Sequence, residues 1–219
     1  MLVTRAEDHP VDLELVRRSY DRVADKYVAL DIGDLGARPW LRGALAAFAE
    51  EVRPLGPVLD VGCGPGTVTA HLAALGLRVA GVDLSPRMIE HARRRHPGLD
   101  FAVGSATELR LADASMGGIL GWWSLFNLPR EVLLTVVASF ARALVPGGQV
   151  LIGLHVGDGE VHRTEAYDGV PVEWTTYLWQ PDQLADVLRS AGLDLVAELR
   201  FPAIARARPQ VLLSARRPG

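Results

Sequence analysis

The sequence has a single cysteine, Cys63, and a single lysine, Lys26, in 219 residues. With one thiol the chain can form neither an internal disulfide nor a cysteine cluster for zinc, which fits a reducing compartment. No run of about 18 apolar residues lacks a charge, and the N-terminal MLVTRAEDHP lacks the apolar segment of an export signal. We therefore expect a cytoplasmic protein that does not span a membrane.

The chain also has no excess of charge of one sign. Its 23 basic and 26 acidic residues are mixed along the sequence and give a net charge of −3, so no broad positive surface would attract phosphates and we expect no nucleic-acid partner. A hydrophobic content of 49% over this length predicts one sizeable core. We expect a single domain over residues 1–219, with an N-terminal helical cap at 1–55 and a sheet core at 56–219.

Periodic patterns predict where the elements lie. Apolar residues at steps of three and four predict amphipathic helices at residues 13–27 and 41–52. From Pro57 onward, short apolar strands alternate with helices, which is the order of a doubly wound α/β sheet that is covered on both faces. The expected strands are residues 58–61, 78–82, 100–103, 118–122, 149–155, 193–200 and 210–215.

Prolines and glycines mark the ends of the expected helices. Pro86, Pro129 and Pro181 each stand at an expected first helical position, where the missing N–H costs nothing. Pro97-Gly98 and Pro146-Gly147-Gly148 are expected to end the helices before them. The segment 157–179 interrupts the alternation, being polar, rich in aromatics and without helical periodicity, so we expect an acceptor-binding excursion there.

The stretch D-V-G-C-G-P-G, which starts at Asp60, joins the first strand to a helix through a turn of small residues. Its three glycines would let backbone N–H groups approach a ligand closely. The third glycine comes one position too early for a dinucleotide fingerprint, and the Asp60 carboxylate would repel a pyrophosphate. A cationic nucleoside such as S-adenosylmethionine fits this loop better.

The same stretch resembles the D/E-x-G-x-G-x-G motif of class I S-adenosylmethionine-dependent methyltransferases, and the chain is most similar to their small-molecule branch. The resemblance implies a Rossmann-like seven-stranded sheet with an antiparallel final strand and N-terminal lid helices. It also implies that the motif residues contact S-adenosylmethionine. Those residues are Asp60, Gly62, Cys63, Gly64 and Gly66.

Further cofactor contacts follow along the chain. Asp83 stands about 20 residues past the loop, where an acidic side chain accepts the ribose hydroxyls. The alternative for Asp83 is a helix cap, a role that Ser85 already fills. By resemblance, Leu84 and Met88 flank the adenine, the Ala106 N–H and the Ser105 hydroxyl bond it, Tyr20 approaches the methionine end, and Trp122 lies beside the transferred methyl group. Ser105 replaces the usual aspartate with a weaker, neutral acceptor.

The acceptor side is less specific in sequence. His155 closes the fifth strand at the edge that carries the glycine loop, and an imidazole that titrates near neutral pH could act as general base. A structural, hydrogen-bonded histidine is the alternative. Aromatic residues Trp123, Trp174 and Tyr177 are candidates for the acceptor pocket, with packing as their alternative role. Trp123 would face away from Trp122 if the strand pattern continued.

The expected function is transfer of a methyl group from S-adenosylmethionine to oxygen or nitrogen of a small molecule, with no metal. A protein that binds this cofactor without transferring methyl is one alternative, and a nicotinamide-dependent oxidoreductase is another. The acceptor and the oligomeric state stay open at this point, because a fold alone does not specify them.

Overall fold

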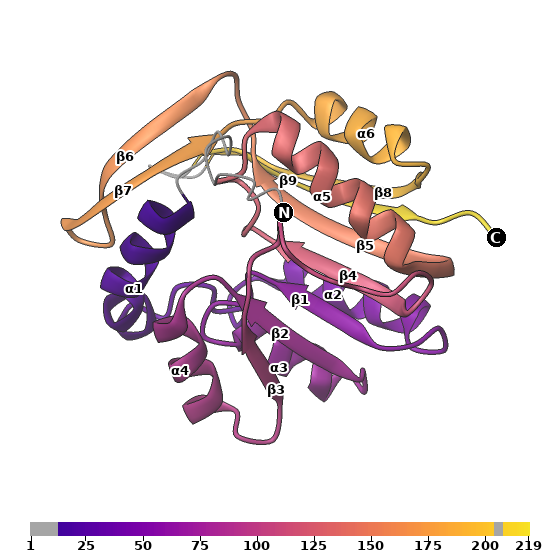
Figure 1. Cartoon of the computed structure of the whole chain (residues 1–219), viewed down its shortest axis with the longest axis horizontal. Helices are drawn as coiled ribbons and strands as arrows, with labels where there is room; N and C mark the ends of the chain where they lie inside the picture. Colours follow the sequence, from indigo (N-terminus) through magenta and orange to yellow (C-terminus); the bar gives the residue numbers. More distant parts are fainter. Residues whose placement is uncertain (1–12, 204–207) are drawn as a thin grey trace, which may run out of the picture.

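The computed structural model of the chain describes residues 13–203 and 208–219. Within these ranges it contains a seven-stranded sheet, a separate two-stranded sheet and flanking helices (Figure 1). The helices are α1 (Leu13–Ala29), α2 (Pro39–Val52), α3 (Thr67–Ala74), α4 (Pro86–Arg95), α5 (Arg130–Ala143) and α6 (Pro181–Ser190). The strands are β1 (Val58–Val61), β2 (Val79–Asp83), β3 (Asp100–Val103), β4 (Met116–Trp122), β5 (Leu144–His155), β6 (Glu160–Ala166), β7 (Val170–Tyr177), β8 (Asp194–Phe201) and β9 (Gln210–Arg216).

The large sheet has the strand order β3-β2-β1-β4-β5-β9-β8. Strands β1 to β5 pair in parallel, and the final strand β9 runs antiparallel to both β5 and β8. The chain order reverses between β1 and β4, and ligands of open α/β sheets bind at the carboxyl ends of the strands at such a point. The expected doubly wound, Rossmann-like sheet with an antiparallel final strand is confirmed.

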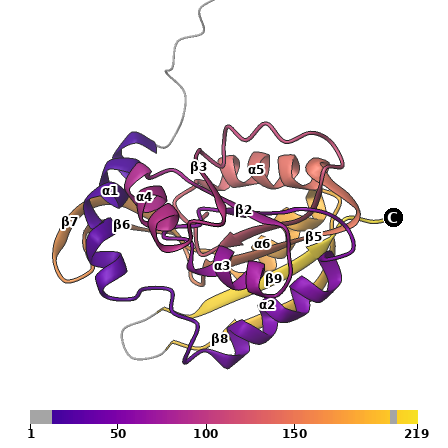
Figure 2. The ribbon, with the colours of Figure 1, turned by 90° about the horizontal axis from the view of Figure 1, so that it is seen from below.

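Apolar clusters hold helices on opposite faces of the sheet. Phe140 of α5 and Leu184 of α6 belong to one cluster, and both side chains are fully buried. Leu45 of α2 and Leu72 of α3 belong to the other cluster. Figure 2 shows α5 and α2 on opposite sides of the strands. This two-sided cover explains why β1 is buried along its whole length and reads as an apolar run broken by one aspartate.

Most expected boundaries are right within one or two residues. β1 and β3 begin and end where the sequence predicts, and β2 begins and ends one residue later than predicted, at Val79 and Asp83. The predicted start of α5 is wrong by one position, because Pro129 is its N-cap and the helix begins at Arg130. The Pro146-Gly147-Gly148 stop is also wrong, since α5 ends at Ala143 and these residues lie within β5.

The excursion over residues 157–179 is a hairpin of β6 and β7 and not an irregular loop. Its sequence is polar because β6 has no buried residue, and in β7 Val172 and Trp174 are buried in a cluster with residues of α1. Residues 1–12 lie outside the described residues. They include the first part of the expected helical cap and the segment MLVTRAEDHP.

Helix α1 lies between α4 and the hairpin, as Figure 1 shows. On the hairpin side, the Ser19 hydroxyl accepts the N–H of Glu173 at 2.8 Å and donates to its carbonyl at 3.2 Å. On the other side, Asp21 accepts the Ser85 hydroxyl at 2.6 Å, and Asp25 lies 2.7 Å from the His91 ring nitrogen Nε2. These polar contacts hold α1 over the carboxyl ends of the strands. Within the described ranges, no helix has the length and apolar character needed to cross a bilayer.

Candidate functional site

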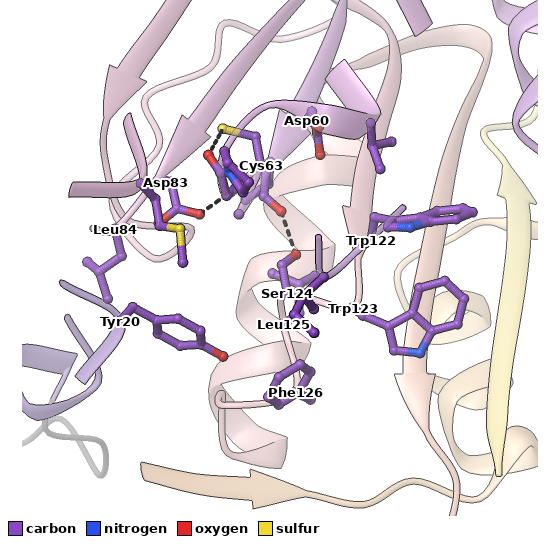
Figure 3. Close-up of a pocket in the computed structure, with 18 of the residues that line it drawn as sticks. Tyr20, Asp60, Cys63, Asp83, Leu84, Trp122, Trp123, Ser124, Leu125 and Phe126 are labelled. Carbon is purple, nitrogen blue, oxygen red and sulfur yellow. Dashed lines mark hydrogen bonds between the residues drawn. The ribbon is translucent and has the colours of Figure 1, made fainter. Parts of the chain in front are cut away.

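A cavity of about 330 Å³ lies at the carboxyl ends of β1, β2, β4 and β5, beside α1 (Figure 3). Its volume falls in the range of small-molecule and cofactor sites. Residues from nine separate helices and strands and from their loops form the wall, so the site exists only in the folded chain. The predicted residues that line it are Tyr20, Asp60, Gly62, Cys63, Gly64, Asp83, Leu84, Met88, Ser105, Ala106, Trp122, Trp123 and His155; Gly66, Trp174 and Tyr177 are outside this lining.

The backbone N–H groups of the glycine loop bind acceptors of the protein itself. Gly62 and Cys63 both donate to the carbonyl of Val82, at 2.7 and 3.0 Å. Gly64 donates to Oδ2 of Asp83 at 2.8 Å, and Gly66 donates to the carbonyl of Cys63. The expectation that these glycines present N–H groups to a ligand is therefore not met in this structure. A phosphate cradle needs such donors free, and this loop does not offer them.

Two of the three motif glycines are required because any side chain at their positions would clash with a neighbouring residue. A Cβ on Gly62, whose φ is +74°, would lie 2.2 Å from Cβ of Ser124. A Cβ on Gly66, whose φ is +81°, would lie 2.8 Å from the ring of Phe101. Gly62 thus allows the end of β4 to approach the loop, where the Ser124 hydroxyl donates to the carbonyl of Val61. Gly66 allows the loop to pack on β3 and makes a contact within the protein.

Asp60 is fully buried in β1 at the floor of the cavity. Its Oδ2 accepts the Thr69 hydroxyl at 2.6 Å, and its Oδ1 has no hydrogen-bond partner among the described residues. Burial raises the pKa of the Asp60 carboxyl to about 7, against the lowering effect of the Thr69 hydrogen bond, and the charge of Asp83 raises it further. A cation beside this carboxyl would favour its ionised form.

Asp83 ends β2 and also faces the cavity. Its Oδ1 accepts the N–H of Ser85 and its Oδ2 accepts the N–H of Gly64, each at 2.8 Å. Burial raises the pKa of Asp83 to about 6, although both hydrogen bonds act in the opposite direction. Each oxygen keeps a lone pair beyond these bonds, so the carboxylate can still accept ligand hydroxyls. The expected cap of α4 is confirmed, because the Ser85 hydroxyl accepts the N–H of Met88.

The segment after β3 brings Ser105 and Ala106 to the cavity. The Ser105 hydroxyl already takes part in a local turn, where it accepts the N–H of Thr107 at 3.2 Å and lies 2.7 Å from the Thr107 hydroxyl. Cys63 lines the same region, and burial raises the pKa of its thiol well above the usual value. Its sulfur therefore stays a neutral, apolar part of the wall.

Trp122 and Trp123 line the cavity together, because the strand pattern that would have turned Trp123 away does not continue past Trp122. β4 ends at Trp122, and Trp123 has a φ of +49°, which breaks the alternation of the strand. The two rings meet edge to face at 4.9 Å. A Cβ on Gly153 would lie 2.9 Å from the Trp123 ring, so this glycine of β5 makes room for the indole.

His155 ends β5 and lines the cavity as expected, 5.0 Å from the ring of Phe126. Burial lowers the pKa of its imidazole to about 4, and the charges of Arg163 and Arg208 lower it further. The expectation that it titrates near neutral pH is therefore wrong: the ring is neutral there. Its Nδ1 is buried and has no hydrogen-bond partner within the described ranges.

The aromatic residues of the hairpin contact α1 and its surroundings. Trp174 stacks on Tyr20 with centroids 4.8 Å apart and planes 1° from parallel. The N–H of Tyr177 donates to the carbonyl of Phe126, which joins the hairpin to the segment after β4. Direct contact of Trp174 and Tyr177 with an acceptor stays a prediction. Neither residue lines the cavity, and their observed contacts are to Tyr20 and Phe126, which do line it.

Sequence reasoning missed several residues of the wall. Arg38, from the connection between α1 and α2, is the one arginine or lysine among the described lining residues. Asn127 accepts the Tyr20 hydroxyl on Oδ1 at 3.1 Å. Phe126 and Gln210 lie near His155, since Phe126 contacts its ring and Gln210 pairs with it in the register of β5 and β9. Phe126 and Asn127 could have been predicted as lining residues from their position directly after β4, because residues there reach the ligand-binding edge of the sheet.

Among the described residues, no group of three or more histidine, cysteine or acidic side chains is placed to hold a metal ion. The functional groups of the site are thus carboxyls on the side of β1 and β2, and aromatic rings with neutral polar groups on the side of β4 and β5. This division separates a part suited to a cationic, hydroxylated ligand from a part suited to a flat, apolar one.

Residues 58–148 match the family model of a methyltransferase domain. A demethylmenaquinone methyltransferase of Beutenbergia cavernae is 35% identical over 135 residues, which cover 61% of this chain and 55% of that protein. The chain thus spans little more than half the length of this curated relative.

Solved structures share the fold over most of the chain. The 1,6-didemethyltoxoflavin-N1-methyltransferase of Burkholderia thailandensis, solved with 1,6-didemethyltoxoflavin and S-adenosylhomocysteine bound, has a TM-score of 0.70 and 22% identity, and the match covers 100% of this chain and 99% of that one. The [4+2]-cyclase SpnF has a TM-score of 0.66 and 18% identity, with 93% and 96% covered. At these identities the likeness establishes the fold alone.

The buried carboxyl of Asp60 gives a prediction for stability against pH. Its folded pKa of about 7 lies above the ordinary 3.8, so the folded state binds more protons between these values. The free energy of unfolding should fall as pH rises through this window, by at most about 1.4 kcal/mol per pH unit from this group. Asp60→Asn should remove that part of the slope in urea titrations at pH 4.5 to 7.5.

Glu50→Gln, at an exposed position of α2, is the control and should keep the slope of the wild type. Asp83 contributes in the same direction, so the difference between wild type and Asp60→Asn is the quantity to compare. An identical slope in Asp60→Asn and wild type would contradict the assignment.

Proposed function

We propose that this chain binds S-adenosylmethionine in the cavity and transfers its methyl group to oxygen or nitrogen of a small molecule, since residues 58–148 match the family model of a methyltransferase domain. The observation that carries the proposal is the loop of Gly62 to Gly64, whose N–H groups all donate to the protein beside the carboxyls of Asp60 and Asp83. Such a wall favours cationic and hydroxyl groups over phosphate.

The residues around β2 fit an adenosine. Asp83 keeps lone pairs for two ribose hydroxyls, and Leu84 and Met88 provide apolar faces on which a base can pack. Asp60 and Tyr20 then lie toward the amino acid part of the cofactor, and the Arg38 guanidinium suits its carboxylate. When bound, this cofactor supplies an electrophilic methyl group on a positively charged sulfur.

The residues around β4 and β5 fit a small acceptor with an apolar, planar part. Trp123 and Phe126 offer ring faces, while His155 and Gln210 offer neutral polar groups. Alignment of the acceptor with the methyl group contributes as much as about 7–11 kcal/mol to such a displacement. The sequence relative that methylates demethylmenaquinone supports a small ring-containing acceptor, and the structural neighbour that methylates 1,6-didemethyltoxoflavin is consistent with it.

We propose that His155 accepts the proton when the acceptor is a hydroxyl group. A hydroxyl oxygen that has bonded to the methyl carbon becomes strongly acidic, so even an imidazole with a pKa of about 4 takes its proton late in the transfer. A neutral amine reacts through its free lone pair and would not need His155.

A protein that binds the cofactor but does not transfer methyl is the second candidate. It is supported by the likeness in fold to SpnF, which is a [4+2]-cyclase. Under that alternative the cavity would hold the cofactor as a structural part of the wall.

A cytoplasmic location, a single domain over the whole chain and the absence of a nucleic-acid partner also stay predictions.

Two measurements test the proposed function. Calorimetry should show saturable binding of S-adenosylmethionine and no binding of NAD at the same concentration. A screen of phenols, enols and amines should then reveal S-adenosylhomocysteine that accumulates only with an acceptor. Binding of NAD in preference to S-adenosylmethionine would contradict the cofactor, and tight binding without any turnover would favour the second candidate.

Asp83→Asn should weaken S-adenosylmethionine binding by more than about 1 kcal/mol, or fivefold in Kd, because an amide accepts hydroxyls on one side only and without charge. Asp83 also anchors Gly64, so the comparison should include thermal unfolding. Unchanged affinity in a folded variant would remove the ribose assignment.

His155→Gln should lower the rate of methyl transfer by about 10²-fold and leave the cofactor Kd within a factor of two, because the imidazole acts on the acceptor and not on the cofactor. The wild-type rate should show no fall between pH 7 and 5 from this residue, since its pKa is about 4. Full activity of the variant would return His155 to a structural role.

A further inference from the structure

The hydroxyl group of Tyr20 is oriented by a residue that the sequence did not point to. Tyr20 lines the cavity from α1, and its O–H lies 3.1 Å from Oδ1 of Asn127, which follows β4. Asn127 lines the same cavity and is 4% exposed. The ring of Tyr20 cannot turn freely either, because it stacks in parallel on Trp174.

The orientation of the Asn127 amide follows from its second contact. Its Nδ2 donates to the carbonyl of Thr175 in β7 at 2.8 Å. A carbonyl only accepts, so the amide nitrogen has to face Thr175 and the amide oxygen has to face Tyr20. Since Oδ1 also only accepts, the Tyr20 hydroxyl donates its single proton to Asn127. The tyrosine oxygen then has only lone pairs left for any other neighbour.

The hydroxyl stays protonated in this position. Burial raises the pKa of Tyr20 well above its ordinary value, and the charges of Tyr167, Tyr27 and Asp83 act in the same direction. The donor arrangement therefore persists over the whole physiological pH range. A neutral tyrosine whose proton is committed to a neighbour presents the negative end of its O–H dipole to the remaining space.

The place of this oxygen in the cavity decides what it can recognise. In Figure 3 the Tyr20 hydroxyl points toward the segment from Ser124 to Phe126, with Asp83 and Leu84 on one side and Trp123 on the other. The oxygen thus lies between the part of the cavity that fits an adenosine and the part that fits an acceptor. The group that passes from one part to the other is the methyl group on the positive sulfur.

We propose that Asn127 is a positioning residue that makes the Tyr20 hydroxyl a pure acceptor facing the sulfonium, so that the site prefers the charged cofactor to its neutral product. The inference rests on the proposed function, which places S-adenosylmethionine in this cavity. In a site that bound both forms equally, S-adenosylhomocysteine would stay bound longer after each turnover than in a site that prefers the charged cofactor. Preference for the positive charge counteracts this product inhibition.

The test compares two ligands that differ in the methyl group and the charge. The Kd values of S-adenosylmethionine and S-adenosylhomocysteine are measured by calorimetry for wild type, Tyr20→Phe, Asn127→Leu and the double variant. The preference for S-adenosylmethionine, taken as the ratio of the two Kd values, should fall by about three- to tenfold in Tyr20→Phe. Asn127→Leu should lower it in the same direction, and the double variant should lower it no further than Tyr20→Phe does.

Ser19→Ala is the matched control. Ser19 lies on α1 next to Tyr20, and its hydroxyl binds Glu173 of the hairpin without lining the cavity. Looser docking of α1 should change both Kd values by the same factor and leave their ratio unchanged. A merely structural role of Tyr20 and Asn127 would have this same effect.

The outcomes separate the two proposals. If wild type binds both ligands and Tyr20→Phe keeps the wild-type ratio, the inference is overturned while the proposed function stands. A ratio that falls as much in Ser19→Ala as in Tyr20→Phe also overturns it. If wild type binds neither ligand, the proposed function fails and this inference fails with it. Tyr20→Phe alone is decisive should Asn127→Leu not fold.

Discussion

The hydrogen bonds between the glycine loop and the end of β2 are the constraint on which the site depends. Gly62 and Cys63 bind the Val82 carbonyl, and Gly64 binds the Asp83 carboxylate. These bonds fix the loop against the neighbouring strand and use the donors that a phosphate would need. They also turn Asp83 toward the cavity. One local set of bonds thus sets both the electrostatic character of the floor and the position of the Asp83 carboxylate.

The rest of the wall comes from parts of the chain that are far apart in sequence. α1 is held by α4 on one side and by the β6–β7 hairpin on the other, and the segment after β4 joins this assembly through Asn127 and Phe126. Because β1 and β2 supply carboxyls, whereas β4, β5 and the segment after β4 supply aromatic rings and neutral polar groups, the cavity has two unlike parts. This division suits the proposed reaction between a cationic cofactor and a flat acceptor.

The fold was largely predictable because its signals are local. β1 and β3 follow from short apolar runs, and α4 and α6 start at prolines that the sequence marks. The hairpin was missed although Asp168-Gly169 is a common turn signal. Its strands have the weak alternation of a ribbon that packs against one helix, and aromatic residues there were taken for a binding loop.

The site was predictable where the motif itself is local and unpredictable where it depends on tertiary contacts. Asp60 and Asp83 come from strand ends and were found. The backbone of Trp123 turns to a φ of +49°, which is rare for a large side chain and has no sequence signal. The low pKa of His155 depends on burial and on Arg163 and Arg208, and the role of Asn127 depends on α1 and β7.

The crowding around Gly62 and Gly66 has a consequence for how such chains are compared. Each glycine is required by a protein neighbour, Ser124 in one case and Phe101 in the other. A descendant that had given up catalysis would still keep both, since any side chain there would disrupt the scaffold itself. These two glycines therefore trace shared ancestry of the architecture. Under the proposed function, Asp83, Tyr20 and Asn127 are the positions at which retention of the chemistry should be judged.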